Sequence, residues 1–302
     1  MSDHVGEGRR AVGDAPHAVP LWAAVAVLIA GFLWSLQGIT IRLLDEATGD
    51  QIIFWRNFAQ CLTLLAAIAI RNNGRVLTAI RTAGKTALLG GTFQATSSVT
   101  VVFAFTLTTV ASVNFILSTS PFIAGFLAWV FLRERLDLKT IGAMAAGAVG
   151  VGVMMSGDIG SGQLLGNALV FIGTVCFSAL TVALRTKRHV DMLPTTFWGS
   201  SIGIIAGLAI AGGTVAMPLH DIALCLFMGS VQIGLGQVLF IMASRHVPAG
   251  LLAFLSLSEI VLGPIWAWLG VNEVPGAMTL LGGVIVMGAL VFQAVAAQRN
   301  RR

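Results

Sequence analysis

The sequence predicts an all-α integral membrane protein in which ten transmembrane helices form two inverted repeats of five helices each. Three observations support this prediction: an apolar composition, ten long apolar stretches, and short motifs that recur in a fixed order. Of the 302 residues, 56% are hydrophobic and only 10% are charged, whereas a soluble domain carries about 25% charged residues. Too few charges remain to cover a surface that faces water, so lipid is the expected solvent for most side chains.

A membrane-spanning helix needs about 20 apolar residues. Ten stretches meet this requirement, at residues 21–43, 51–70, 86–107, 110–132, 138–156, 163–185, 193–213, 221–244, 248–270 and 275–297. They are predicted to be helices because isolated strands and loops cannot satisfy their backbone hydrogen bonds in hydrocarbon. The polar residues 1–18 before them are predicted to form a disordered cytoplasmic tail.

The distribution of positive charge predicts the orientation of these stretches. When the N-terminus is placed inside the cell, every Lys and Arg except Arg42 and Arg56 falls in an inner segment. Cytoplasmic loops carry such an excess of Lys and Arg, so both termini are predicted to be cytoplasmic, in the cell inner membrane. Because these charges lie between stretches and not on one face, the net charge of +5 does not indicate nucleic acid as a partner.

The two halves of the chain repeat one another. Four pairs of matching segments occur in the same order: Phe54-Trp55 with Phe197-Trp198, Ser35 and Arg42 with Ser178 and Arg185, Gly91 and Gln94 with Gly229 and Gln232, and Ala111 and Ser118 with Ala249 and Ser256. Such self-similarity marks an internal duplication, and we place the copies at residues 21–156 and 163–297. Each copy has an odd number of stretches, so the copies must be inverted, which is typical of secondary transporters.

Several segments carry a resemblance to a known family. They are Leu33-Trp34-Ser35, Phe54-Trp55-Arg56-Asn57, Ser118-Thr119-Ser120-Pro121, Leu132-Arg133-Glu134 and Ile141-Gly142. Together they resemble the EamA domain of the drug/metabolite transporter superfamily, and the resemblance covers about residues 21–297. The second copy departs from the pattern, since Glu259 stands where Pro121 stands in the first copy, and Glu273 is one place out of register with Glu134.

The resemblance implies a ten-helix carrier that moves small metabolites by alternating access, often outward. We therefore expect a secondary transporter, an exporter of an amino acid or a derivative, with no cofactor or metal. The expected partners are a small-molecule substrate, the lipid bilayer and protons as the coupling ion; a homodimer is left open. Uptake, a channel, a structural subunit and a membrane-embedded enzyme are the alternatives, although the five histidines are scattered over loops and tails, which does not favour an enzyme.

Glu259 is the first candidate for the transport site. It lies eleven residues into its stretch, roughly 16 Å from the start and near the bilayer centre. A charge there costs at least about 2.5–3.5 kcal/mol on insertion scales. Three interpretations remain open: handling of substrate or protons, a structural ion pair, and a place in a water-filled vestibule.

Arg56 is the second candidate. It lies five residues below the predicted outer end of its stretch, roughly 8 Å deep, which leaves an axial gap of about 9 Å to Glu259. A guanidinium fork fits a substrate carboxylate, and the alternative is that the side chain extends to the outer interface. Arg42, at the end of the first stretch, is predicted to be an interfacial anchor.

Six further residues inside the stretches complete the predicted binding or coupling site: Trp34, Gln37, Gln94, Asn114, Ser118 and Gln232. The repeat mates Gln94 and Gln232 are expected to approach the pseudo-twofold axis from opposite sides. Hydrogen bonding between helices is the alternative for each polar residue, and core packing is the alternative for Trp34. Pro121 and Pro264 are expected to interrupt their helices.

Overall fold

The computed structural model describes residues 20–133, 137–157, 162–185, 192–244, 246–247 and 249–299, and the regular structure in these residues is helical. In chain order the helices of the first half are α1 (Leu21–Ser35), α2 (Gln37–Arg42), α3 (Gly49–Arg71), α4 (Val76–Leu107), α5 (Val110–Leu117), α6 (Ser120–Leu132) and α7 (Leu138–Gly157). Those of the second half are α8 (Leu164–Arg185), α9 (Met192–Ile210), α10 (Leu219–Phe227), the π-helix η1 (Met228–Leu235), α11 (Gly236–Ser244), α12 (Ala249–Val271) and α13 (Ala277–Arg299).

Eight segments of the described chain are long and apolar enough to cross a membrane, which confirms the predicted all-helical membrane character. They are Leu21–Arg42, Gly49–Arg71, Val76–Leu107, Val110–Leu132, Leu138–Gly157, Leu164–Ala183, Met192–Ile210 and Leu219–Ser244. The last two predicted stretches coincide with α12 and α13, where the described apolar parts are the shorter Ser258–Val271 and Ala277–Gln293. Glu134, one of the residues that carry the resemblance, and the predicted tail at residues 1–18 lie outside the described residues.

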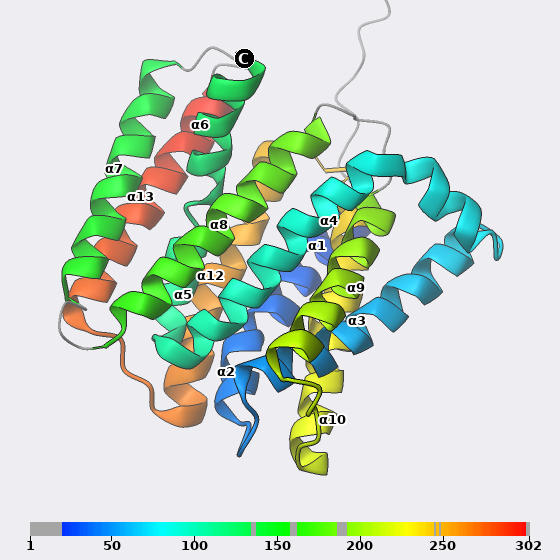
Figure 1. Cartoon of the computed structure of the whole chain (residues 1–302). Helices are drawn as coiled ribbons and strands as arrows, with labels where there is room; N and C mark the ends of the chain where they lie inside the picture. The colour runs from blue at the N-terminus through cyan, green and yellow to red at the C-terminus, as the bar shows by residue number, and fades with distance from the viewer. Residues whose placement is uncertain are drawn as a thin grey trace, which may run out of the picture.

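Helix α4 begins ten residues earlier than predicted, at Val76 instead of residue 86. The backbone of Gly84 has φ 63° and ψ −162°, so the chain turns there between two helical parts. Glycine adopts this conformation without the steric penalty of a side chain. Figure 1 shows the first part of α4 turning across the end of the bundle before the rest of the helix enters it.

Several spanning segments are interrupted near their middle. Helices α5 and α6 are separated at Ser118 and Thr119, and Pro121 is the second residue of α6, where its missing N–H is harmless. Pro264 lies inside α12. The predicted interruption at Pro121 is therefore a break and restart of the helix. A second irregularity, the π-helix η1, contains Gln232, and such segments occur often at functional sites.

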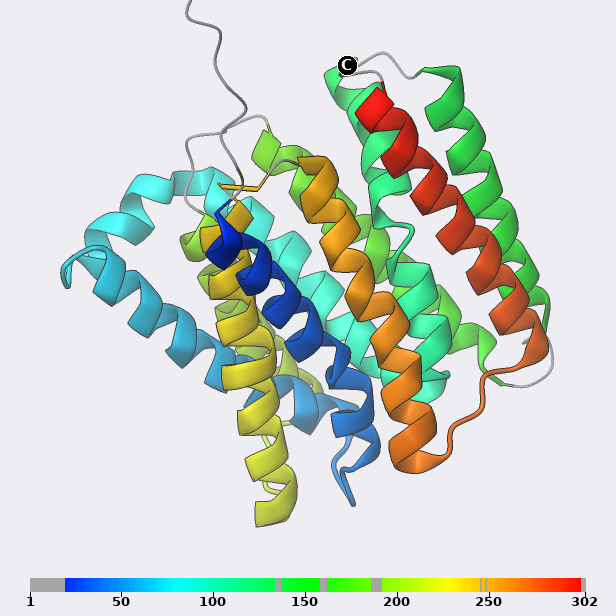
Figure 2. The ribbon, with the colours of Figure 1, turned by 180° about the vertical axis from the view of Figure 1, so that it is seen from behind.

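Close helix contacts are made through glycines. A Cβ at Gly150 of α7 would lie 2.8 Å from the carbonyl oxygen of Gly282 in α13, and one at Gly207 of α9 would lie 2.7 Å from the amide nitrogen of Phe54 in α3. Small residues let backbones approach in this way inside membranes. In Figure 2, α1 lies between α11 and α12, in agreement with its contacts to both helices.

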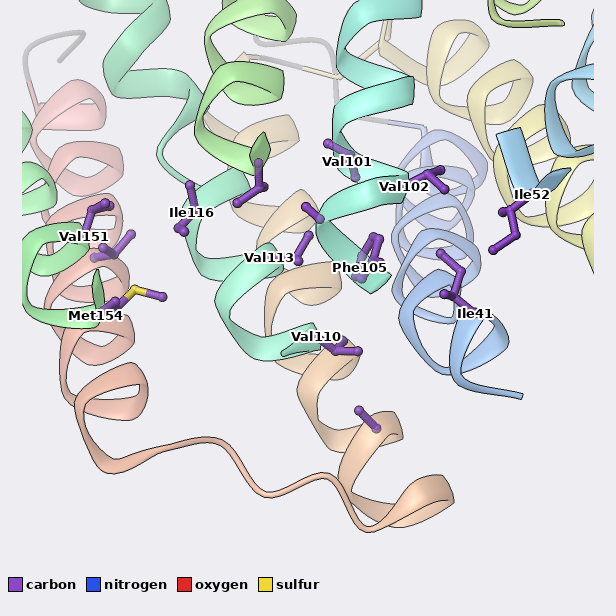
Figure 3. Packing of buried hydrophobic residues seen from close by; sticks show 14 of the residues in the cluster. Ile41, Ile52, Val101, Val102, Phe105, Val110, Val113, Ile116, Val151 and Met154 are labelled. Atoms are coloured by element: carbon purple, nitrogen blue, oxygen red, sulfur yellow. The ribbon is translucent and has the colours of Figure 1, made fainter. Parts of the chain in front are cut away.

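The largest apolar cluster joins both halves of the chain. Figure 3 shows Val110, Val113 and Ile116 of α5 beside side chains of α4, with Val151 and Met154 of α7 on the other side. Residues of the second half, such as Val286, belong to the same cluster. This shared core fixes the positions of α4 and α5, which carry Gln94 and Asn114 of the predicted site, and of Ser118 directly after α5.

Candidate functional site

Arg56 is buried in the middle of the bundle, on α3. Its side chain is only 3% exposed, so the predicted alternative of extension to the interface is wrong. Its Nη2 donates to the hydroxyl and to the carbonyl oxygen of Ser98 on α4, and its Nε has no acceptor. Within the described chain no carboxylate pairs with it, Glu259 included. A buried guanidinium without a counter-charge is destabilising unless a ligand compensates it.

The hydroxyl of Ser98 also connects Arg56 to the next residue of α3. Ser98 donates to Asn57 Oδ1 at 3.3 Å, and Asn57 Nδ2 donates to the carbonyl of Ile53 at 2.7 Å. Arg56 and Asn57 are 3% and 1% exposed. The α3–α4 contact at this level is therefore a polar contact buried inside an apolar bundle.

Glutamine side chains extend this polar region from α4 to η1 and α11. Gln60 of α3 donates to Gln237 Oε1 at 2.8 Å, and Gln232 of η1 donates to Thr40 Oγ1 at 2.7 Å. Gln94 lies one turn before Ser98 on α4, and a Cβ added at Gly199 of α9 would lie 2.6 Å from its Cγ. The Oε1 atoms of Gln94 and Gln232 are both buried without a donor.

The repeat mates Gln94 and Gln232 lie on two elements that contact Arg56 through other residues. Gln232 follows Gly229 by three residues, and Gly229 lies directly against the backbone carbonyl of Arg56. Gln94 is on the face of α4 that carries Ser98, the hydrogen-bond partner of Arg56. We call Arg56, Gln94, Ser98 and Gln232 the Arg56 cluster.

Glu259 lies elsewhere, on the part of α12 that packs against α1. A Cβ at Gly31 would lie 3.8 Å from the amide nitrogen of Glu259. The side chain is half-buried, and within the described chain its carboxylate has no hydrogen bond and no ion pair. The predicted alternative of a structural ion pair is therefore wrong for the described residues.

Asn114 and Ser118 lie near Glu259 and not in the Arg56 cluster. The amide of Asn114 on α5 lies directly against Gly263 of α12. Helices α5 and α12 run in opposite directions. Ser118 is one turn after Asn114, and Glu259 is one turn before Gly263, so the two residues lie at the same height along the helix axes. Ser118 directly follows the end of α5, where the helix breaks before α6.

Trp34 and Gln37 lie around the junction of α1 and α2. The ring of Trp34 contacts Phe240 of α11 with centroids 5.2 Å apart, and a Cβ at Gly236 would lie 2.7 Å from its Nε1. These contacts favour the packing role for Trp34. Gln37 is half-buried one turn before Thr40, the partner of Gln232.

Arg42, predicted to be an interfacial anchor, forms an ion pair. Its Nε lies 2.7 Å from Glu273 Oε2, and its terminal nitrogens donate to the carbonyls of Phe105 and Thr108 at 2.7 and 2.6 Å. Glu273 Oε1 accepts from the amide of Val110 at 2.6 Å. This pair, which joins residues 231 positions apart, is not predicted from the sequence. The presence of two opposite charges at predicted outer ends was the available signal.

One group of side chains at the same end has ligand atoms close enough for a cation: Asp45, His220 and Asp221, all within 4.8 Å of one another. The buried Asp221 carboxylate, however, already accepts from the backbone amides of Asp45 and Glu46, both at 3.0 Å. His220 is 3.9 Å from Asp45 and is exposed. We assign this group to the attachment of α10 to the loop after α2.

The chain is similar to a known protein family, to curated relatives and to solved structures. A model of the EamA-like transporter family matches residues 21–156 and again residues 164–294. The pseudopaline exporter CntI of Pseudomonas aeruginosa is 24% identical over 272 residues, which cover 87% of this chain and 93% of that protein. Human solute carrier family 35 member G1 is 23% identical, over 89% of this chain and 77% of that protein. A crystal structure with 16% identity has the same fold, with a TM-score of 0.67 over 93% of this chain and 99% of the other.

Proposed function

Because this chain belongs to the EamA-like transporter family, we propose that it is a secondary carrier that exports a small polar metabolite, an amino acid or a derivative. Of the two relatives named above, one is an exporter and the other is a solute carrier, and neither is named as an enzyme. The chain is a multi-pass membrane protein, and we place it in the cell inner membrane. Transport would proceed by alternating access around a site near the middle of the bundle.

The proposed architecture has ten spans in two inverted repeats of five, with both termini in the cytoplasm. In the proposed repeat, α1 corresponds to α8, α3 to α9, and α4 to η1 and α11. The corresponding pairs make matching contacts: α4 packs on α8 as α11 packs on α1, and α4 packs on α9 as η1 packs on α3. Figure 2 also shows α1 beginning and α13 ending at the same end of the bundle, as an even number of spans requires. The distribution of Lys and Arg supports the orientation.

The observation that carries the proposal is that two ionisable side chains inside an apolar bundle, Arg56 and Glu259, have no counter-charge among the residues that the structure describes. Ionisable residues inside membrane spans mark substrate or ion pathways. We assign substrate contact to the Arg56 cluster. We assign coupling to Glu259, with Asn114 and Ser118 at the helix break beside it, and protons as the coupling ion. Gln37 would line the region between the Arg56 cluster and Glu259, and Trp34 would support it by packing against α11.

A flux measurement tests this proposal. Inside-out membrane vesicles containing the protein are incubated in a medium with a metabolite mixture of amino acids, organic acids, amines and sugars, with and without an imposed proton gradient, and their contents are compared with those of vesicles lacking the protein. We expect accumulation of an amino acid or derivative above empty vesicles, and a dependence on the gradient. No accumulation of any compound under either condition would refute the carrier function, and accumulation without gradient dependence would refute the coupling role.

A further inference from the structure

The first part of α4, residues 76–83, is a short helix with a turn at each end, and we call it the entry helix. In the turn before it, Asn73 and Gly74 have φ angles of 49° and 79°. The turn after it is at Gly84, with φ 63°. Figures 1 and 2 show the entry helix lying across the end of the bundle at which α1 begins and α13 ends. It therefore runs along this end of the bundle and not through it.

One face of the entry helix packs on the bundle. Val76 and Ala79 contact a buried cluster of side chains from α3, α9 and α11. Ile80 is partly buried and Ala83 is buried. These four residues are three or four positions apart in turn, which places them on one helical face. The other face of the entry helix is left for contacts outside the bundle.

The outer face of the entry helix and its two ends carry positive charge. Arg75 directly before the helix, Arg81 within it and Lys85 after it are exposed. Among the described residues none of the three forms an ion pair, and the sequence has no Asp or Glu from residue 51 to residue 133. Leu77, one turn before Arg81 on the same face, is 60% exposed. The surface thus combines three cations without a counter-charge and an apolar side chain.

The surroundings of the entry helix belong to the surface that faces lipid. Ile70, at the end of α3, is 79% exposed. Leu88 and Leu89, just after the turn at Gly84, are exposed as well. All three lie in segments that are long and apolar enough to cross a membrane, where exposed apolar side chains contact acyl chains. The cations of the entry helix are therefore close to the level at which lipid headgroups begin.

The second half of the chain indicates that the fold does not need a basic helix at this place. In the proposed repeat, the connection between α3 and α4 corresponds to the one between α9 and α10. That connection, residues 211–218, contains no helix and no Lys or Arg. The entry helix is thus a feature of one half and of one end of the bundle. Its charges must serve something other than joining two spans.

We propose that the entry helix binds the headgroups of anionic phospholipids through Arg75, Arg81 and Lys85, with Leu77 inserted among the acyl chains beside them. Guanidinium and ammonium groups donate strong hydrogen bonds to phosphate oxygens. A basic residue near a membrane surface raises the affinity for anionic lipid roughly fivefold. A soluble acidic partner would account for the cations and leave the exposed apolar side chains around them unexplained. The inference concerns lipid alone and does not depend on which solute the carrier moves.

Lipid retention tests the inference. The purified full-length protein in detergent is incubated with equal amounts of phosphatidylglycerol and phosphatidylethanolamine that have the same acyl chains. Lipids retained after gel filtration are then counted by mass spectrometry. We expect an excess of the anionic lipid of about tenfold or more, since three cations contribute. Added salt should reduce this excess, because salt screens exposed charges.

Charge variants locate the binding. Arg81→Gln should lower the excess of phosphatidylglycerol roughly fivefold, and Arg81→Lys, which keeps the charge, should preserve it. Arg75→Gln, Arg81→Gln and Lys85→Gln together should bring retention of the two lipids close to equal. Arg133→Gln is the matched control, because it removes an exposed cation at the end of α6 and away from the entry helix. It should leave the excess unchanged.

The inference is overturned if the original protein retains both lipids equally, if the triple variant keeps the full excess, or if Arg133→Gln lowers it as much as Arg81→Gln. Displacement of phosphatidylglycerol by an equal concentration of inorganic phosphate would also overturn it, because the site would then bind the anion and not the lipid. If the triple variant gives no single peak in gel filtration, the comparison of Arg81→Gln with Arg81→Lys decides. No flux is measured, so failure here leaves the proposed carrier function intact.

Discussion

The charges at one end of the bundle and those in its middle differ in how fully their hydrogen bonds are satisfied. Arg42 is bonded to Glu273 and to two backbone carbonyls, and Glu273 uses its other oxygen for the amide of Val110. Arg56 reaches only Ser98, and Glu259 has no partner within the described chain. Among these four side chains of the described residues, Arg42 and Glu273 form a complete ion pair, whereas Arg56 and Glu259 have no counter-charge.

This difference separates structural charges from functional ones better than burial does. A guanidinium whose donors are all used has no capacity left for a ligand, whereas an unpaired buried charge raises the free energy of the empty protein until a ligand neutralises it. We therefore expect variants of Arg42 to lose stability and variants of Arg56 to lose binding and transport.

The largest effect is expected for Arg56→Gln. Loss of a charge-assisted hydrogen bond to the substrate corresponds to about 1.5–3 kcal/mol, or roughly 10–100-fold in transport efficiency. The thermal unfolding temperature should stay the same or rise, because a buried unpaired charge has been removed. Initial rates in vesicles and unfolding in detergent measure both, with Arg133→Gln as the control. Normal transport by Arg56→Gln would assign Arg56 to structure.

A smaller loss of transport is expected for Glu259→Gln, roughly tenfold, at the lower end of the same range. Glutamine cannot bind or release a proton, so the remaining rate should no longer respond to an imposed proton gradient. Glu273→Gln is the matched control, because Glu273 is already paired and should leave the response to the gradient unchanged. If Glu259→Gln transports normally across pH, Glu259 has no part in coupling.

The Arg42–Glu273 pair should contribute to the free energy of unfolding. Arg42→Gln and Glu273→Gln should each lower the free energy of unfolding by about 1–3 kcal/mol, because each leaves a partly buried charge without its partner. The side chains are 26% and 16% exposed, so the effect falls short of that for a fully buried pair. The double variant should lose less than the two single losses combined. Strict additivity in chemical unfolding would show that the two residues are not coupled.

The helices could be predicted from the sequence because apolar length is a local property. The start of α4 was misplaced, since the turn at Gly84 lets a more polar helical part precede the apolar one. Glu259 and Arg56 could be found because an ionisable residue inside an apolar stretch is conspicuous without any structure. Their lack of ion-pair partners could not be predicted from the sequence, since pairing depends on which helices lie against one another.

The partner of Arg42 could not be predicted from the sequence either. Its position at the end of a stretch predicts contact with the interface, yet its partner lies 231 residues away in the other half of the chain. Likewise, the repeat indicated that Gln94 and Gln232 approach a common axis, but only the hydrogen bond to Thr40 shows which amide atom is left unsatisfied. Tertiary packing decides both cases.

The smallest effect is expected for Ser98→Ala. The hydroxyl of Ser98 holds the Nη2 of Arg56, so its loss should leave the guanidinium less well positioned and raise the substrate concentration for half-maximal transport. One neutral hydrogen bond contributes about 0.5–1.5 kcal/mol, or roughly 2–13-fold, while the maximal rate should be kept. Thr96→Ala is the matched control, because the exposed Thr96 bonds only its own helix, at Thr92, 3.0 Å away. If Ser98→Ala abolished transport as fully as Arg56→Gln, the substrate would be bound through Ser98 itself; if it changed nothing, Arg56 would be positioned by other contacts.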